Sequence, residues 1–418
     1  MLNRPTTSPL PHFLLILLLT LTGCGESPQP PAEELGKESW RAEVAVPPPS
    51  QPKAPPGELD RALMIGVVGP LTGEGAEFGQ QVRDGLMTAA HAFNDAGGID
   101  GQPIGVIIGD NEGDSELTRG IVQGFLQKNV LAIFAAPTGW STFAATQIVN
   151  RSETLFIAVG PRRRISRSGP YIFRLALADE IAIAALTKMA VSQMGLKRFA
   201  LVTSSLYEHS LTTSALFKQA LPVEGGEIVV EGDTYDTYTG QSGPDKVVPT
   251  LLKVDPPVDG ILFTGGDEEG ATLAQALQKA GIKAPLLGNE DLFTDQFLQA
   301  GGEAVVGSRL YSTWHPKSDT PHMGRFQTGF SQVSKLGVPE RFAALAYDGF
   351  MLLAEAIQKA RSTKPSQVRE VLVNPEGFPG ATGQTAFAED GEAIKEPVLM
   401  EVQSLNGQIQ FVPLPPES

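Results

Sequence analysis

Residues 64–110 read MIGVVGPLTGEGAEFGQQVRDGLMTAAHAFNDAGGIDGQPIGVIIGD, and this stretch decides the fold class. Residues 64–68 are a short apolar run that ends at a Gly-Pro pair, as a buried strand does. Apolar residues then recur at spacings of three and four, which predicts an amphipathic helix through Phe78, Val82, Leu86, Ala90 and Phe93. A Gly-Gly pair ends this helix, and residues 104–108 are a second apolar run. The pattern predicts a strand–helix–strand unit.

The same alternation continues along the chain and repeats after Ala178. We expect helices near residues 117–128, 141–150 and 342–357, and strands at residues 130–134, 155–159, 199–202, 228–230, 261–263, 286–287, 385–387, 398–402 and 409–412. A repeated strand–helix order predicts parallel sheets with helices on both faces. Two such series predict two α/β lobes. Ligands of such sheets bind beyond the carboxyl ends of the strands, so the predicted site is the cleft between the lobes.

The composition excludes several classes of protein. The chain has 418 residues, of which 41% are apolar, so it can form two or three globular domains. Its net charge of -15 argues against nucleic-acid binding, which needs clustered cations. A single cysteine excludes an internal disulfide framework, and five scattered histidines argue against a His-rich metal site. We therefore expect neither a metal nor a cofactor.

The amino-terminal segment has the pattern of a secretory signal. Arg4 precedes the apolar stretch FLLILLLTL at residues 13–21, which is far shorter than the roughly 20 residues that span a bilayer. The Leu-Thr-Gly-Cys sequence ending at Cys24 resembles the bacterial lipobox, in which cleavage precedes a cysteine that carries diacylglycerol. We expect a signal peptide over residues 1–23 and a lipid on Cys24, which would hold the chain on a bilayer. The alternative is a plain signal peptide with a buried or free thiol.

Residues 24–60 are expected to form a disordered tether. Nine prolines lie between Gly25 and Asp60, and apolar periodicity is absent. Such a composition favours extended chain at roughly 3.1 Å per residue, so the segment could reach on the order of 100 Å from a membrane.

Signatures of common enzymes are absent. No G-x-S-x-G, H-E-x-x-H or G-x-x-x-x-G-K-[ST] motif occurs. The glycines that follow the first strand are one residue off the dinucleotide-binding fingerprint. Asp110, Glu112 and Asp114 begin like a calcium loop, but Ile121 stands where the bidentate glutamate belongs, which indicates a solvated loop. We expect no catalytic residues and a protein that is not an enzyme.

The ordered series of segments resembles one known family. The opening from Ile65 to Asp114, with AALAYDGFMLLAEAI (343–357) and GATGQTAFAEDGE (380–392), is similar to the bacterial Leu/Ile/Val-binding proteins, periplasmic receptors of ABC importers. The resemblance spans about residues 62–412 and implies the type I periplasmic binding protein fold: two Rossmann-like α/β lobes with parallel sheets, joined by a three-strand hinge. We expect an N-terminal lobe and a C-terminal lobe formed by residues 61–175 plus 310–384 and residues 176–309 plus 385–418, respectively.

The resemblance implies a set of ligand-binding residues. The family's serine/threonine loop matches Ser141 and Thr142, which would hold a carboxylate and which also fit an ordinary helix cap. The family's tyrosine at the start of a second-lobe helix matches Tyr207. Its ammonium-binding glutamate, in a Gly-x-Glu context, matches Glu290, which would otherwise be an exposed loop acid. Phe78 matches an aromatic lining position, and its helical spacing fits core packing as well.

Several positions depart from the family pattern. Small residues and a hydroxyl usually follow the fourth strand, whereas here Gly160 is followed by a proline and three arginines. Arg162 is the best candidate among these for a bidentate contact to an anionic group, with a solvated loop as the alternative. Asp267 stands where an aromatic often lines the pocket, and Trp140 replaces a small residue. Asp267 with Glu290 would favour a cationic or multiply hydrogen-bonding end of the ligand.

These observations predict a receptor anchored through Cys24 that binds a small polar solute, an amino acid or a related carboxylate, without chemistry. Hinge closure on the ligand would present both lobes to an ABC permease in the membrane. A second hypothesis is an envelope sensor or regulatory lipoprotein that uses the same fold without transport, because a fold does not determine function.

Overall fold

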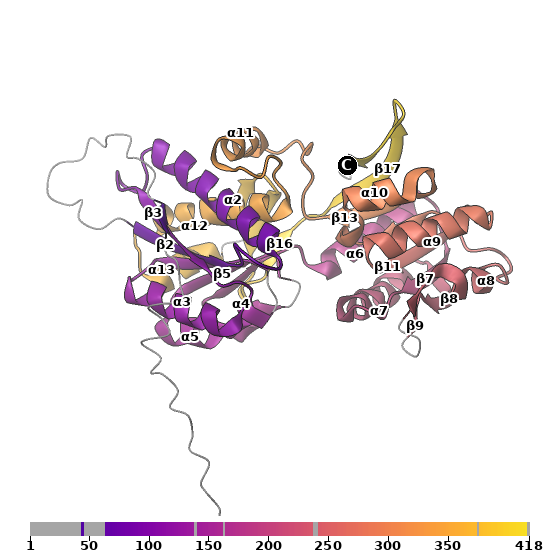
Figure 1. Ribbon diagram of the computed structural model, residues 1–418, viewed down its shortest axis with the longest axis horizontal. Coiled ribbons are helices and arrows are strands. Elements are labelled where there is room, and N and C mark those ends of the chain that lie inside the picture. The colour runs from indigo at the N-terminus through magenta and orange to yellow at the C-terminus, as the bar shows by residue number, and fades with distance from the viewer. Residues whose placement is uncertain are drawn as a thin grey trace, which may run out of the picture.

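The computed structural model describes residues 43–45, 63–137, 140–161, 164–236, 241–373 and 376–415. Two α/β lobes lie side by side and are joined by narrow connecting segments, which confirms the predicted fold class (Figure 1). The predicted signal peptide at 1–23, Cys24 and most of the predicted tether lie outside the described residues. Within the described ranges, no helix combines the length and the apolar character needed to cross a membrane.

The first lobe is built on a six-stranded sheet in the order β1-β3-β2-β4-β5-β6. β2 to β6 run parallel, and β1 pairs antiparallel with β3. Apolar residues on both faces of the sheet are buried, with α2, α11 and α12 packed on one face and α3 and α5 on the other. The strands are β1 (Glu43–Ala45), β2 (Leu63–Gly69), β3 (Ile104–Asp110), β4 (Ala132–Ala135), β5 (Leu155–Val159) and β6 (Ile172–Leu175). The helices are α2 (Ala76–Asp95), α3 (Ser115–Gln127), α4 (Trp140–Ala144), α5 (Thr146–Ser152), α11 (Met323–Val333), α12 (Arg341–Ala360) and α13 (Pro365–Leu372).

The second lobe is built on a seven-stranded sheet in the order β18-β17-β13-β12-β11-β7-β8. The five strands from β13 to β8 run parallel, and β17 and β18 form an antiparallel hairpin at one edge. α9 and α10 pack on one face of this sheet, and α6 and α7 pack on the other. The strands are β7 (Arg198–Thr203), β8 (Glu227–Asp233), β11 (Gly260–Thr264), β12 (Leu286–Gly288), β13 (Arg309–Ser312), β17 (Val398–Leu405) and β18 (Gln408–Pro413). The helices are α6 (Asp179–Lys188), α7 (Glu208–Val223), α8 (Val248–Leu251), α9 (Asp267–Lys279) and α10 (Asp295–Gly301).

Two small sheets complete the described structure. β9 (Tyr235–Asp236) and β10 (Gln241–Ser242) pair with each other beyond the end of β8. β14 (Phe378–Gly380), β15 (Gly383–Phe387) and β16 (Ala393–Lys395) form a three-stranded antiparallel sheet beside the first lobe.

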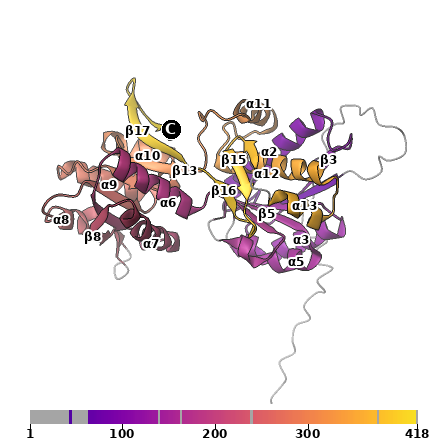
Figure 2. The same cartoon turned by 180° about the vertical axis from the view of Figure 1, so that it is seen from behind.

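Three segments connect the lobes. The first leads from β6 to α6, the second from β13 towards α11, and the third from β16 to β17, where the yellow ribbon passes from one lobe to the other (Figure 2). The first two leave their lobes at the carboxyl ends of parallel strands. The third enters at Val398, which pairs with Ser312 at the carboxyl end of β13. The carboxyl edges of both sheets therefore face the junction between the lobes.

The lobe boundaries differ from the expected ones at two places. β13 lies inside the second sheet, between β12 and β17, so the first lobe resumes after residue 312 and not at 310. β15 and β16 belong with β14, and Glu392 bridges to Arg174 of β6, so the first lobe runs to residue 395 and not to 384. Pairing between strands that are far apart in the sequence decides both boundaries.

Several elements, β13 among them, depart from the sequence expectations. β1 lies within the predicted tether, where it pairs with the otherwise unpaired edge of β3. β6 was not predicted, because Arg174 interrupts its apolar run. The helix predicted over residues 141–150 is two helices, α4 and α5, divided at Ala145.

Candidate ligand-binding site

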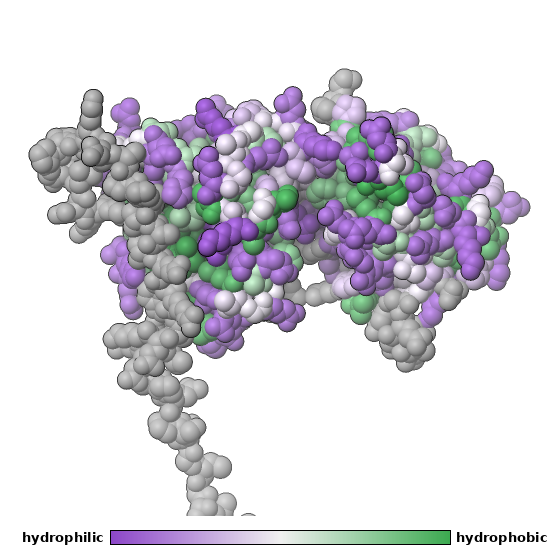
Figure 3. Space-filling view, turned by 45° about the horizontal axis from the view of Figure 1, so that its top comes forward, coloured by the Kyte–Doolittle hydropathy of each residue, from purple (hydrophilic) through white to green (hydrophobic). Residues whose placement is uncertain are grey.

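The predicted ligand-binding residues follow the carboxyl ends of strands. In the first lobe, Phe78 comes after β2, Ser141 and Thr142 come after β4, and Gly160 comes directly after β5. In the second lobe, the corresponding residues follow three strands that are neighbours in the sheet: Tyr207 after β7, Asp267 after β11 and Glu290 after β12. Both groups lie at the sheet edges that face the junction, and the molecular surface is hollowed between the lobes (Figure 3).

Ser141 and Thr142 are buried in the first-lobe wall. Both residues belong to α4, a helix of only five residues and shorter than the one expected there. The Thr142 hydroxyl donates a hydrogen bond of 2.6 Å to the Ala136 carbonyl, which fixes the loop between β4 and α4. The side chain of Trp140 lies outside the described part of the structure, so its predicted contact with the ligand stays a prediction.

An aromatic pair covers the first-lobe wall beside Gly160. Phe78 is 37% exposed, and its ring meets Phe342 edge-on at 5.3 Å between centroids, so it both packs and faces solvent. Gly160 has φ 74°, and a methyl group there would lie 2.6 Å from the Phe342 ring, so only glycine fits. The Arg341 guanidinium lies 4.7 Å from the Phe342 ring centroid. The sequence pattern gives no signal for Arg341 and predicts Phe342 only as the start of the helix over residues 342–357.

The arginine run after Gly160 is only partly described. Arg162 lies outside the described residues, so its predicted contact with the ligand stays a prediction. Arg164 forms an ion pair with Glu180 of α6, with 2.7 Å between Nη2 and Oε1. This contact joins the first lobe to the second.

Tyr207 and Asp267 lie next to each other on the second-lobe wall. Tyr207 precedes α7, is 45% exposed, and has its hydroxyl 3.4 Å from where a methyl group on Gly266 would be. Partial burial and the negative charges of Glu269, Asp267 and Glu268 raise the pKa of the Tyr207 hydroxyl. Asp267 accepts hydrogen bonds from the Thr294 hydroxyl at 2.7 Å and from the Glu268 backbone N–H at 2.9 Å. Its carboxylate is therefore engaged within the lobe, which weakens its expected role as a ligand contact.

Glu290 reaches the second connecting segment. Its Oε2 accepts hydrogen bonds from Thr313, at 3.3 Å from the backbone N–H and at 3.0 Å from the hydroxyl. Thr313 directly follows β13, where the chain leaves the second lobe. The carboxylate is partly buried and is not the exposed loop acid of the alternative interpretation. A ligand group bound to Glu290 would therefore lie close to the second connecting segment.

Comparison with known proteins agrees with this fold. The family model described as Periplasmic binding protein matches residues 62–408. The chain belongs to the periplasmic binding protein family. Membership implies a solute-binding protein in an extracytoplasmic location.

Individual relatives of this periplasmic binding protein are distant. A protein of Brucella melitensis named Leu/Ile/Val-binding protein homolog 3 is 25% identical over 336 residues, which cover 79% of this chain and 88% of that protein. An ABC transporter substrate-binding protein from Sphaerobacter thermophilus has a TM-score of 0.72 at 21% identity, covering 85% of this chain and 96% of that one. A branched-chain amino acid transporter substrate-binding protein from Streptococcus pneumoniae, in complex with isoleucine, has a TM-score of 0.64 at 21% identity. The match covers 85% of this chain and 100% of that one.

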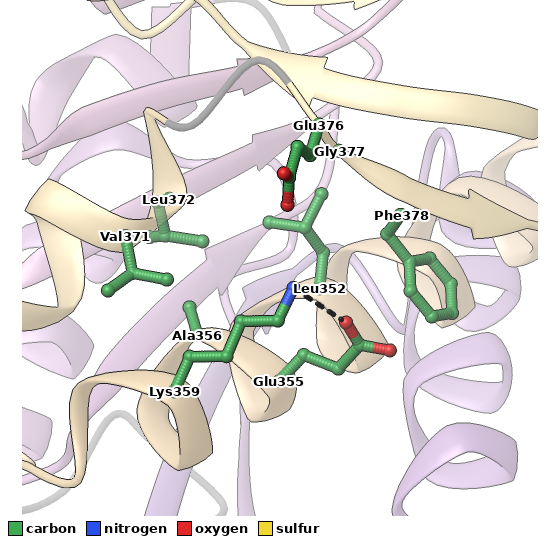
Figure 4. A pocket seen from close by; sticks show the side chains of 9 residues that line it. All are labelled: Leu352, Glu355, Ala356, Lys359, Val371, Leu372, Glu376, Gly377 and Phe378. Carbon is green, nitrogen blue, oxygen red and sulfur yellow. Dashed lines mark ion pairs between the residues drawn. The ribbon is translucent and has the colours of Figure 1, made fainter.

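One pocket outside the junction is too small to hold a ligand. A pocket between α12 and α13 is lined by Leu352, Leu372 and Phe378, and Lys359 pairs there with Glu355 at 3.5 Å (Figure 4). Its volume of about 20 Å³ suits a single water molecule. Among the described residues, no group of three or more His, Cys, Asp or Glu side chains is arranged to hold a metal ion.

Proposed function

We propose that this chain is the solute-binding receptor of an ABC importer and that it binds an amino acid or a related small carboxylate between its lobes. The observation that supports the proposal is the arrangement of the junction between the lobes. All three connecting segments lie at the carboxyl edges of the two parallel sheets, and the residues matched to the family's ligand site follow those edges.

Each wall would bind a different end of the ligand. Ser141 and Thr142 of the first lobe would hold the carboxylate through the Ser141 hydroxyl and backbone N–H groups, because the Thr142 hydroxyl already donates to Ala136. Arg162 would be a further contact to the anionic end of the ligand. Glu290 would bind the α-ammonium, because a partly buried carboxylate is its natural partner. Tyr207 would close over the ligand from the second lobe.

The remaining predicted positions would shape the cleft. Phe78 and Trp140 would line it on the first lobe, and Gly160 would keep the Phe342 ring close to the cleft wall. Asp267 would act indirectly, because its carboxylate is already hydrogen-bonded to Thr294.

Binding would drive closure without any chemical step. A ligand that touches both walls stabilises the closed form by the difference between its affinities for the closed and open forms. The closed form would present a surface built from both lobes to a membrane permease. A lipid on Cys24 and the proline-rich segment up to residue 60 would keep the receptor near that permease.

The test is a ligand screen with two readouts. We would titrate the mature chain with L-leucine, L-lysine, L-glutamine and 4-hydroxybenzoate by calorimetry, and record small-angle X-ray scattering with and without each compound. We expect at least one amino acid to bind with micromolar or tighter affinity and to reduce the radius of gyration. Failure of every amino acid and carboxylate to bind would overturn the proposal.

A further inference from the structure

Glu269 has a buried carboxylate without a partner in the second lobe. It lies in the first turn of α9, and both of its carboxylate oxygens are buried and form no hydrogen bond. A carboxylate that leaves water without gaining a partner carries a large desolvation penalty. Such a group calls for an explanation, and a bound ligand that provides the missing partner is one.

Two glycines place this carboxylate at the carboxyl edge of β11. A methyl group on Gly265 would lie 2.9 Å from Glu269 Oε2, and one on Gly266 would lie 3.4 Å from the Tyr207 hydroxyl. β11 lies between β7, which leads to Tyr207, and β12, which leads to Glu290. The helix that carries Glu269 therefore follows the strand between those that lead to the two second-lobe residues assigned to the ligand.

Glu269 is one of three acidic side chains that act on Tyr207. The charges that act on the neighbouring Tyr207 are all negative and come from Glu269, Asp267 and Glu268. Asp267 is hydrogen-bonded to Thr294, and Glu268 is exposed to water. Of these three side chains, Glu269 is the one that is both removed from water and unpartnered.

We propose that Glu269 determines ligand specificity by binding a second cationic group of the ligand, separate from the α-ammonium assigned to Glu290. The inference rests on the proposed function and narrows it to amino acids with a positively charged side chain. A leucine-like side chain would close the cleft over the same carboxylate and leave it unpaired in a drier environment. The unpaired Glu269 carboxylate would then cost more free energy in the closed form than in the open form. This cost argues against a branched-chain ligand.

The test uses two ligands that differ by one charged group. L-Lysine is L-norleucine with an ammonium at the end of the side chain. We expect the wild-type chain to bind L-lysine at least about tenfold more tightly than L-norleucine, because a hydrogen bond to a charged group typically contributes that much affinity. Glu269→Gln should reduce L-lysine affinity by about 10- to 100-fold and change L-norleucine affinity by less than about threefold. Glu268→Gln, one residue away on the exposed side of the same turn, should change neither.

The outcomes separate this inference from the proposed function. Equal binding of the two amino acids by the wild type, or equal losses in Glu269→Gln, would overturn the role of Glu269 and leave the receptor function standing. Binding of 1,5-diaminopentane that depends on Glu269, with no amino acid bound, would support Glu269 and overturn the amino-acid function. Binding of none of the three compounds would overturn the role of Glu269, while the screen of amino acids and carboxylates would still decide the receptor function. Thermal unfolding of the apo variants controls for folding, and we expect Glu269→Gln to be at least as stable as the wild type, because it removes a buried charge.

Discussion

Arg164 and Glu180 form an ion pair across the junction between the lobes. Arg164 Nη2 lies 2.7 Å from Glu180 Oε1, and the two side chains come from the loop after β5 and from the first turn of α6. The connecting segment between β6 and α6 is short, so this contact lies beside the first hinge segment. Burial alone would raise the pKa of Glu180, but a backbone hydrogen bond and Arg164 outweigh burial and lower it.

We predict a small stabilising effect for this pair. The side chains of Arg164 and Glu180 are 32% and 47% exposed, so water and salt screen the attraction. Glu180→Gln should lower the free energy of unfolding by less than about 1 kcal/mol, and the loss should disappear in 0.5 M salt. Urea unfolding of Arg164→Gln, Glu180→Gln and the double variant measures the coupling. A coupling above about 2 kcal/mol would show that the pair is shielded from water.

Glu290→Gln should weaken binding of an amino-acid ligand. The carboxylate is the charge assigned to the α-ammonium, and loss of one member of a buried charge pair weakens binding by about 2–5 kcal/mol. Calorimetry with the ligand found in the screen measures the change. Thr313→Val is the control, because it removes a donor to Glu290 Oε2 but keeps the carboxylate. We expect this variant to retain ammonium binding. Unchanged affinity in Glu290→Gln would remove Glu290 from the site.

The sequence predicts the parallel strands of both lobes wherever they are continuous apolar runs, and it fails where a charge interrupts the run. Arg174 interrupts the apolar run of β6, and β13 has only two apolar residues, Leu310 and Tyr311, after Arg309, so neither resembles a buried strand. Their partners are Glu392, 218 positions away, and Glu401, 92 positions away. Local periodicity carries no information about such pairs, which is why these two strands and the lobe boundaries beside them were mispredicted.

Local sequence also does not show which carboxylate on the second-lobe wall lacks a partner. The sequence singles out Asp267, because it follows the Gly265-Gly266 pair where the family often has an aromatic residue. In the structure Thr294, 27 positions away, donates to Asp267 and leaves Glu269 as the carboxylate without a partner. Which acid of a cluster remains available depends on contacts from other elements, and these contacts appear only in the folded chain.

The Arg174–Glu392 pair should contribute strongly to the stability of the first lobe. The two side chains are 4% and 9% exposed, and Arg174 Nε lies 2.8 Å from Glu392 Oε2. Arg174 also donates to the Pro161 carbonyl at 3.0 Å, which ties the loop after Gly160 to β6. Glu392→Gln leaves a buried guanidinium without its counter-charge and should lower the free energy of unfolding by about 3–5 kcal/mol.

A matched pair on the second lobe provides the control for Glu392→Gln. Arg198 and Glu227 are 3.1 Å apart, but their side chains are 27% and 64% exposed. Glu227→Gln should therefore cost less than about 1 kcal/mol in the same urea experiment. Equal losses in the two variants would contradict the argument from burial.

His315 should make the protein less stable in mild acid. The side chain is 3% exposed on the second connecting segment, its ring lies 5.6 Å from Phe293, and its Nδ1 accepts a hydrogen bond of 3.1 Å from the Lys317 backbone N–H. Burial lowers the pKa of His315 to about 4, with the charge of Lys317 acting in the same direction and a hydrogen bond with the Phe411 backbone opposing it.

The direction of the pH effect follows from which state binds the proton. Well above pH 6.5, the ordinary pKa of the side chain, His315 is neutral in both states and its contribution does not vary. Between pH 6.5 and 4 the unfolded chain binds a proton that the folded chain excludes, so stability falls as the pH falls, by about 2 kcal/mol between pH 7 and pH 5. His315→Asn keeps an acceptor near the Lys317 N–H without a titrating ring and should flatten this part of the profile. Urea unfolding at pH 7, 6 and 5 measures it, with His91→Asn on α2 as a control that should leave the slope in place. A slope that survives His315→Asn would assign the acid sensitivity to another group.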